Sequence, residues 1–533
     1  MSRERRLPGE VASAGLAIGP LLRLAEAGDA AAAPQGDPAT ERDRLAAAMD
    51  AARAGLAALA EAADAMAAEI LEFQLAMLDD PALTETILPA IAEGAPATAA
   101  WRTALEAQVA EYAAAEDDYF RARAADMADL RDRVLGHLAG AAGEVEAADG
   151  AILLARDLGP SRFLGFDWRR LGGAVLEAGS RTSHVAMLAR ARGVPLLTGV
   201  GAVAANGGDL AVLDAQDGLL VLDPGEATRA AYAARHAGAA AETAAAGAAL
   251  AKPAVLRSGE RVRTQVNVDD PAALDDALLL ASDGVGLMRT EFLFLGRDRL
   301  PDEDAQLAAY ADLLRRAAGR PVTVRTLDVG GDKPLPGVSL PQESNPFLGL
   351  RGIRLCLERP ALFRPQVRAL LRAAPLGPLK VMLPMVAVPD ELAEAAALFA
   401  AELAGLETAG VAAAMPALGI MVEVPAAAVA IERFDGAAFF SIGTNDLVQY
   451  TLAASRDSGG RVGRLADPLD PAVLRLIAGV VACGRASSRE VGVCGDMASD
   501  PRGVAALLDL GVRSLSVAPA ALGRVKAAVQ GHG

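Results

Sequence analysis

Cysteine is scarce in this chain, with three among 533 residues. Cys356, Cys483 and Cys494 are too few and too widely spaced for a disulfide framework, and no two of them have the spacing of a zinc site. Histidine is almost as scarce, with four residues, so a metal site built from several histidines is not expected. This usage indicates a reducing compartment, and we expect a cytoplasmic protein.

Long apolar runs are missing as well. Hydrophobic residues make up 53% of the chain but aromatic residues only 4%, so alanine accounts for much of the apolar content. No uninterrupted run reaches the roughly 18 residues that a membrane-spanning helix needs. The N-terminus lacks the continuous apolar core of a signal peptide. The sequence therefore predicts no membrane association.

Basic residues are outnumbered, with 51 Lys and Arg against 68 Asp and Glu, a net charge of −17. Such a chain repels nucleic acid phosphates and anionic lipids, so neither is an expected partner. An anionic substrate would need a local basic pocket.

The length suggests three or four domains at about 150 residues each. The order of strand-like and helix-like stretches divides the chain accordingly. Short β-rich runs occupy residues 1–24 and 145–225, and the run DLAVLDAQDGLLVLD in the second block has a hairpin-like centre. Between them, residues 25–144 repeat apolar side chains at helical spacing, which predicts an all-helical insert in one α/β domain. We expect a linking helix over residues 226–253, ended by Pro253.

The helical insert carries most of the negative charge. From Asp37 to Gly140 there are 20 acidic residues against 8 arginines and no lysine, a net charge of −12. One interpretation is a helical bundle kept in solution by its charge. The other is a docking surface for a small basic protein, whose approach would be electrostatically steered.

Residues 254–533 alternate strand-like and helix-like segments eight times over 280 residues. A (β/α)₈ TIM barrel has about 250 residues, so this pattern predicts a C-terminal barrel and makes the chain an α/β multidomain protein. Active sites in this fold lie at the carboxyl ends of the strands. We therefore expect the chemistry at those ends.

Charged and polar residues stand at successive predicted strand ends. Arg289 and Arg325 could form bidentate hydrogen bonds with a phosphate or carboxylate. Glu423 and Asp446 are hard oxygen donors that suit Mg²⁺. This set favours a small phosphorylated anion as substrate. Further candidates at the same mouth are Lys333, Asn445, Arg456 and Cys494.

Cys494 has two interpretations. Its place at a strand end would let a protonated thiol act as an acid, whereas a small buried hydrophobic residue is the alternative. The residues alone leave both open.

A second group of residues is the segment GSRTSHVAMLARARGVP, residues 179–195. A glycine loop leads into a helix for which Ser183 or Thr182 is the expected cap. His184 then lies in the first turn, where free backbone N–H groups and the helix dipole favour an anion. A phosphate carried on the imidazole would be stabilised there. A purely structural histidine is the alternative.

The stretch SRTSHVAMLAR resembles the phosphohistidine signature of the Enzyme I family of the bacterial phosphoenolpyruvate:sugar phosphotransferase system. Other segments are similar to the phosphoenolpyruvate-binding barrel of that family: DGVGLMRTEFLF, VRTLDVGGDK, SNPFLGLRGIR, GIMVEVPAA, FFSIGTNDLVQYTLA and VCGDMASD. The resemblance runs in order from about Gly9 to Lys526, and so covers nearly the whole chain.

The resemblance implies a phosphoryl relay. Phosphoenolpyruvate would bind at the barrel mouth with Mg²⁺ on Glu423 and Asp446, and His184 would attack the phosphorus through Nε2. Cys494 would protonate the enolate to pyruvate. The implied substrate contacts are Arg289, Arg325, Lys333, Asn445, Asp446 and Arg456.

The partners implied by the resemblance are a histidine phosphocarrier protein (HPr or a nitrogen-type equivalent), docked on the helical insert, and a second copy of the chain, bound through the barrel. Both a sugar-uptake branch and a regulatory nitrogen-type branch stay open.

Two other functions compete with the relay. Pyruvate phosphate dikinases and phosphoenolpyruvate synthases share the mobile histidine domain and the barrel, but they need an ATP-grasp domain that the sequence does not provide, and no P-loop pattern is present. A non-catalytic phosphoenolpyruvate-sensing scaffold would have lost its nucleophile or a metal ligand, and both residue types are in place.

Overall fold

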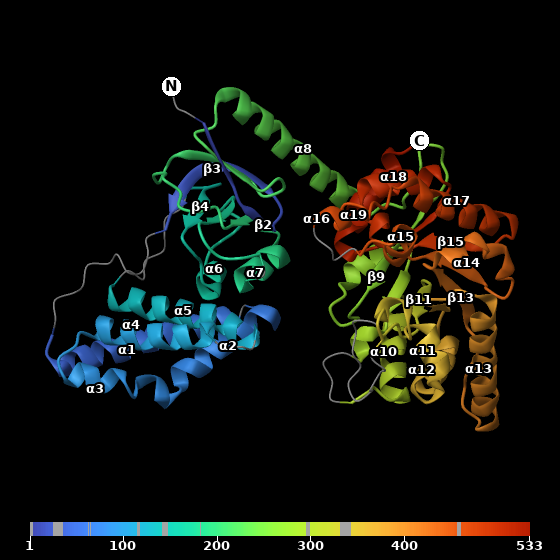
Figure 1. Ribbon diagram of the computed structural model, residues 1–533, viewed down its shortest axis with the longest axis horizontal. Coiled ribbons are helices and arrows are strands. Elements are labelled where there is room, and N and C mark those ends of the chain that lie inside the picture. Colours follow the sequence, from blue (N-terminus) through green and yellow to red (C-terminus); the bar gives the residue numbers. More distant parts are fainter. Residues whose placement is uncertain are drawn as a thin grey trace. The chain divides into compact units, whose positions relative to one another are not determined.

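The computed structural model describes residues 4–24, 36–61, 63, 65–114, 118–140, 148–181, 183–294, 299–330, 343–455 and 460–533. The chain forms two compact units, Met1–Ala239 and Ala240–Gly533, shown in blue to green and in green to red (Figure 1). Across the described ranges, no helix combines the length and the apolar character that crossing a membrane requires.

The first unit contains an eight-stranded mixed sheet in the order β1-β8-β7-β3-β4-β5-β6-β2. Strands β3 to β6 run parallel to one another, and the remaining pairings are antiparallel. The predicted hairpin is confirmed as β7 and β8, joined by a turn with Gly218 at φ +69°. The strands are β1 (Arg5–Pro8), β2 (Glu10–Ser13), β3 (Leu16–Arg23), β4 (Ile152–Ala155), β5 (Gly173–Leu176), β6 (Leu196–Thr198), β7 (Leu210–Asp214) and β8 (Leu219–Leu222).

Five helices interrupt this sheet between β3 and β4. Their buried side chains, such as Leu45, Leu71 and Leu130, belong to the same hydrophobic core as Leu153 on the sheet and Leu188 on the helix after β5. In Figure 1 these helices lie on the side of the sheet that carries α6 and α7. The five helices are α1 (Pro38–Glu61), α2 (Ala65–Asp79), α3 (Ile87–Ala92), α4 (Ala97–Ala113) and α5 (Asp118–Leu138); α6 (Pro160–Leu164) follows β4 and α7 (His184–Arg192) follows β5.

The shared core has a consequence for the site. Because the five helices pack on the sheet without a solvent layer, side chains of α5 hold fixed positions relative to α7. The opposite face of the sheet has its own core, which includes Leu21, Leu154 and Leu213.

A long helix, α8 (Glu226–Leu250), begins in the first unit and ends in the second. At its start, buried Tyr232 packs with sheet residues, and Arg235 donates to the buried Asp214 carboxylate at 2.7 Å. At its end, the Lys526 ammonium donates to the backbone carbonyls of Leu250 and Lys252 at 3.0 and 2.9 Å. Each end is thus held by specific polar contacts.

Eight parallel strands of the second unit close into a barrel, which confirms the predicted fold. Alternate side chains face the surrounding helices and make one large core, of which Val324, Val381 and Phe440 are examples. The strands are β9 (Arg263–Val268), β10 (Val285–Arg289), β11 (Val322–Arg325), β12 (Leu379–Leu383), β13 (Ala417–Val422), β14 (Phe439–Ile442), β15 (Glu490–Val493) and β16 (Ser514–Val517).

Helices surround the barrel and connect its strands. The α-helices are α9 (Asp276–Ala281), α10 (Glu303–Arg316), α11 (Ile353–Glu358), α12 (Pro360–Ala373), α13 (Pro389–Thr408), α14 (Pro425–Val429), α15 (Thr444–Leu452), α16 (Gly460–Gly463), α17 (Pro471–Ala486), α18 (Pro501–Asp509) and α19 (Leu522–Gly531). Short 3-10 turns of this unit are η2 (Glu291–Leu293), η3 (Pro346–Leu348), η4 (Ala374–Leu376), η5 (Ile431–Arg433), η6 (Asp496–Ala498) and η7 (Pro519–Ala521), and η1 (Pro81–Thr84) lies in the first unit between α2 and α3.

Candidate active site

The barrel places most of the predicted mouth residues at strand ends. Arg289 and Arg325 are the last residues of β10 and β11, Glu423 directly follows β13, and Cys494 directly follows β15. Because all eight strands are parallel, these ends open on one mouth.

Buried ion pairs fix Arg325 in place. Its Nη2 donates to Glu291 Oε1 at 2.7 Å, and its Nη1 lies 3.3 Å from Asp328 Oδ2. Asp328 in turn accepts two hydrogen bonds from Arg351, at 3.2 and 2.9 Å. A bidentate arrangement of this kind holds both guanidinium groups in defined orientations before any anion binds.

Arg289 is more accessible than Arg325. Its Nη1 contacts both oxygens of Asp269, at 3.0 and 3.2 Å. The Arg289 side chain keeps 30% of its surface exposed, so it is available to an incoming anion.

Glu423 and Asp446 form the carboxylate pair of the mouth. Glu423 is buried, and its Oε1 accepts a hydrogen bond from the backbone N–H of Met385 at 2.7 Å. Burial, followed by the charges of Asp446 and Asp328, raises the pKa of Glu423 to about 8. Asp446, in the first turn of α15, lies 3.4 Å from Arg351 Nη1.

This pair fits a divalent cation. The negative charges of two neighbouring carboxylates repel each other, and a cation that binds between them removes this repulsion. Hard oxygen donors suit Mg²⁺. Among the residues that the structure describes, no cluster of three or more His, Cys, Asp and Glu side chains could hold a metal. Waters and substrate oxygens would therefore have to complete the coordination.

A glycine makes room for the Glu423 carboxylate. A Cβ at Gly443 would lie 2.9 Å from Glu423 Oε2 and 3.0 Å from the Met421 side chain. Such contacts are closer than packed atoms allow. The glycine of the SIGTNDL segment is therefore required by the carboxylate beside it.

Asn445 pairs with the loop after β15. Its Nδ2 donates to Asp496 Oδ2 at 3.0 Å, and its Oδ1 accepts from the Asp496 backbone N–H at 2.8 Å. These two bonds tie the start of α15 to the turn that carries Cys494.

The Cys494 thiol is buried at 2% exposure and packs in an apolar cluster inside the barrel with Leu287, Met382 and Met421. Burial raises the pKa of this thiol, so it is protonated near neutral pH. Ser441 Oγ lies 3.3 Å from the sulfur. The thiol therefore fits the interpretation as an acid, and its burial also fits the apolar alternative.

His184 is the first residue of α7 in the other unit. Ser183 caps this helix, because its hydroxyl accepts from the Ala186 N–H at 3.2 Å. The helix ends at Gly193, which adopts the left-handed conformation common at helix ends. Thr182, the other expected cap, lies outside the described residues.

A carboxylate from the helical insert holds the imidazole. Nδ1 of His184 lies 2.9 Å from Oδ1 of Asp126, which is fully buried on α5. The second oxygen of Asp126 accepts from Arg123 at 3.1 Å. A carboxylate at Nδ1 favours the tautomer with hydrogen on Nδ1, which leaves the Nε2 lone pair free to act as a nucleophile.

Two predicted substrate contacts, Lys333 and Arg456, lie outside the described residues. Two residues of the site were not predicted. Arg351 lies in the segment SNPFLGLRGIR, which the resemblance included without assigning it a role. Asp126 is 58 positions from His184 and carries no local signal in the sequence.

Three family models match the chain. Residues 8–123 match "PEP-utilising enzyme, N-terminal", residues 147–218 match "PEP-utilising enzyme, mobile domain", and residues 243–532 match "PEP-utilising enzyme, PEP-binding domain". The third model alone covers more than half of the chain, from the end of α8 to the end of the barrel.

Curated phosphoenolpyruvate-protein phosphotransferases are similar to this chain over most of its length. The chain is 39% identical over 528 residues to the phosphoenolpyruvate-protein phosphotransferase of Geobacillus stearothermophilus, covering 97% of this chain and 91% of that protein. It is 39% identical over 461 residues to that of Bacillus subtilis, covering 84% and 80%. A solution structure of an Enzyme I protein is 25% identical, with a TM-score of 0.34, and covers 44% of this chain and 98% of that one.

The closed barrel, its charged mouth and the three matching models define a phosphoenolpyruvate-utilising enzyme. Within that class, the chain belongs to the phosphoenolpyruvate-protein phosphotransferase family.

Proposed function

We propose that the chain transfers the phosphoryl group of phosphoenolpyruvate to His184, releasing pyruvate, and then to a histidine of a phosphocarrier protein. The observation that carries this proposal is the contact between His184 Nδ1 and the buried Asp126 carboxylate at 2.9 Å. A structural histidine would have no need of a free ring nitrogen, whereas a phosphoryl acceptor needs one. Asp126 holds Nδ1 and so leaves Nε2 as the free ring nitrogen.

The barrel mouth supplies the phosphoenolpyruvate site in this proposal. Arg289 and Arg325 bind the anionic groups of the substrate, and Arg351 adds a third guanidinium that is already oriented by Asp328. Positioning and electrostatic stabilisation dominate phosphoryl transfer, because the transferred group carries its charge on oxygens. Asn445, Asp446, Lys333 and Arg456 complete the proposed contacts.

Mg²⁺ is the proposed metal, held by Glu423 and Asp446. When bound, it neutralises charge on the phosphoryl oxygens. The chain's own part is to keep both carboxylates at the mouth, which the Met385 N–H and Gly443 do for Glu423.

Cys494 is the proposed proton donor. When phosphoenolpyruvate loses its phosphoryl group, the remaining enolate must gain a proton at its methylene carbon to become pyruvate. A thiol whose pKa is raised by burial stays protonated until a strong base is beside it. The enolate is such a base, so the thiol keeps its proton until the enolate forms.

The carrier protein is proposed to dock on the acidic helical part, residues 25–144. Its net charge of −12 over Asp37–Gly140 would steer a small basic partner towards it. Asp126 on α5 brings this surface next to His184. The division into residues 1–24 and 145–225 for the phosphohistidine domain, 226–253 for the linker and 254–533 for the barrel belongs to the same proposal.

A homodimer through the barrel and a cytoplasmic location complete the proposal. Exposed apolar side chains such as Val429 and Leu465 on the barrel unit support a covered surface there. The three cysteines are free, which suits a reducing compartment.

Labelling with ³²P-phosphoenolpyruvate and Mg²⁺ tests the relay. We expect an acid-labile, base-stable label on the wild-type chain and on the control His137→Ala, whose histidine lies on α5. The label should be lost in His184→Ala. A label of normal yield in His184→Ala would overturn the proposal.

A further inference from the structure

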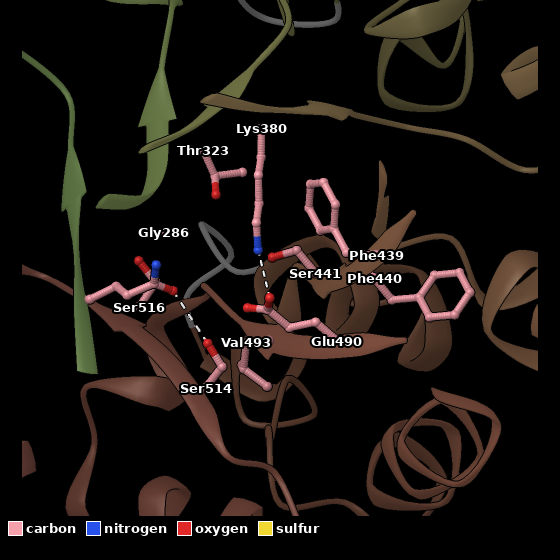
Figure 2. A pocket seen from close by; sticks show the side chains of 12 residues that line it. Gly286, Thr323, Lys380, Phe439, Phe440, Ser441, Glu490, Val493, Ser514 and Ser516 are labelled. Carbon is pink, nitrogen blue, oxygen red and sulfur yellow. Dashed lines mark hydrogen bonds and ion pairs between the residues drawn. The ribbon is translucent and has the colours of Figure 1, made fainter. Parts of the chain in front are cut away.

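A polar cavity lies inside the barrel, where most barrels of this fold are filled by branched apolar side chains. It has a volume of about 20 Å³ and is lined by polar groups that include Lys380, Ser441, Glu490 and Ser514. Figure 2 shows the Lys380 ammonium and the Glu490 carboxylate facing each other beside the Ser441 hydroxyl. A cavity of this size and polarity can hold about one water molecule.

The cavity belongs to the end of the barrel opposite the active-site mouth. Glu490 and Ser514 are the first residues of β15 and β16, and Lys380 is the second residue of β12. Lys380 and Glu490 form an ion pair at 2.5 Å, and each side chain keeps 24% of its surface exposed. The ion pair therefore stands between solvent and the cavity.

Ser441 connects this cavity with Cys494. It is the third residue of β14, directly before the last residue Ile442, and its exposure is 6%. Its Oγ both lines the cavity and lies 3.3 Å from the Cys494 sulfur. One hydroxyl thus reaches from the polar cavity to the buried thiol.

The position of Cys494 creates a need for such a connection. A thiol that has protonated the enolate must regain a proton before the next turnover. On the mouth side, bound substrate or pyruvate covers it, and inside the barrel it packs against the apolar side chains of Leu287, Met382 and Met421. A hydroxyl group is the kind of neighbour through which a proton can pass.

We propose that protons reach Cys494 through the opposite end of the barrel, by way of Lys380, a cavity water and Ser441. This inference rests on the proposed role of Cys494 as proton donor. In the forward step, the S–H proton forms the new C–H bond of pyruvate and the electron pair stays on sulfur. The thiolate then takes the Ser441 hydroxyl proton, Ser441 takes one from the cavity water, the water takes one from the Lys380 ammonium, and bulk solvent reprotonates Lys380.

Ser441 and Lys380 are relay residues in this scheme, because they act on the reaction through Cys494. The infrared S–H stretching band of the thiol gives a readout that does not depend on activity. The band is assigned by its absence in Cys494→Ala, and its loss after dilution into D₂O gives the exchange rate of the thiol proton with solvent.

We expect Ser441→Ala to slow this exchange by about tenfold or more at saturating pyruvate, because the hydroxyl that is hydrogen-bonded to the sulfur is removed. Lys380→Met, which removes the proposed ammonium donor, should slow it in the same direction. Thr323→Val is the matched control, since Thr323 lines the same cavity on β11. The buried thiol of Cys356 on α11 is an internal reference for general loosening of the fold.

Exchange at Cys494 that is equally fast in the wild type and Ser441→Ala, with an unchanged Cys356 band, would overturn the path. A slowing of both bands together would also count against it, because it would reflect a change of the whole unit. Pyruvate formation separates this result from the proposed function. If Cys494→Ala forms pyruvate at the wild-type rate, the donor role itself fails, whatever Ser441 does.

Discussion

At the scale of single residues, the hydrogen bond between Asp126 and His184 is the contact whose loss should matter most to the chemistry. In Asp126→Asn the charge that favours hydrogen on Nδ1 disappears, and Arg123 loses its ion pair with Asp126 while its contact with Glu69 stays. We expect the rate of His184 phosphorylation to fall by about 10- to 100-fold, because a fraction of the imidazole carries its hydrogen on Nε2. Rapid-quench labelling with ³²P-phosphoenolpyruvate measures this rate.

Asp132→Asn on the same helix is the control, since Asp132 is 44% exposed and pairs with Arg131. Its phosphorylation rate should equal that of the wild type. Equal rates in Asp126→Asn and the wild type would show that the carboxylate does not orient the imidazole.

Glu423 gives a second prediction at this scale, on stability and pH. Its pKa lies above the ordinary value of 4.5, at about 8, so the folded protein binds this proton more tightly than the unfolded chain does. The free energy of unfolding therefore falls as pH rises from about 4.5 to about 8. Above about pH 8, the ionised Glu423 carboxylate destabilises the folded protein to its full extent. Glu423→Gln removes the charge and should be more stable than the wild type at pH 8.5, by on the order of a few kcal/mol.

Denaturant unfolding of the barrel unit at pH 8.5 and pH 5 measures this difference. The difference in unfolding free energy between Glu423→Gln and the wild type should be smaller at pH 5. Saturating Mg²⁺ should stabilise the wild type but not Glu423→Gln. A variant that is less stable than the wild type at pH 8.5 without Mg²⁺ would contradict the expectation.

The residues of the site differ in how far the sequence could reveal them. Arg289, Arg325 and Glu423 stand at strand ends, and the strand pattern therefore located them. Asp126 reaches His184 only because the insert packs on the sheet through a shared core. A tertiary contact of this kind leaves no periodic pattern in the sequence, so the sequence alone does not predict it.

At the scale of elements, helix α7 positions His184 through its cap. Ser183 accepts the Ala186 N–H, and a capping side chain of this kind contributes about 1 kcal/mol. We expect Ser183→Ala to lower the free energy of unfolding of the first unit by about that amount. Ser183→Asn, which keeps an accepting oxygen, should retain most of the stability. Urea unfolding followed by circular dichroism compares the three proteins, and equal midpoints would show that the cap contributes little.

Elements with strong periodicity were the ones that the sequence revealed. The eight barrel strands and the β7–β8 hairpin follow from apolar runs bounded by turns. The order of the first sheet, in which β2 lies at one edge beside β6 and β1 at the other beside β8, does not. Strand order depends on which faces pack on which helices, and residues close in sequence, such as β1 and β2, separate for that reason.

At the scale of the whole molecule, the chain consists of two units with separate cores. The sheet and helices of Met1–Ala239 pack among themselves, and so does the barrel of Ala240–Gly533. The boundary falls within α8, where the side chains from Ala233 to Ala245 are exposed. Few buried contacts are therefore lost if the chain is divided there, and each unit should fold alone.

We expect residues 1–239 and 240–533, made separately, each to unfold cooperatively, and the intact chain to unfold as the sum of both curves. The barrel fragment should bind phosphoenolpyruvate but take up no label, because it lacks His184. The first fragment should gain no label from phosphoenolpyruvate and should accept phosphate from a phosphorylated carrier protein. Calorimetry and labelling measure both properties. A barrel fragment that is unfolded, or an intact chain that unfolds in one transition absent from both fragments, would mean that the cores depend on each other.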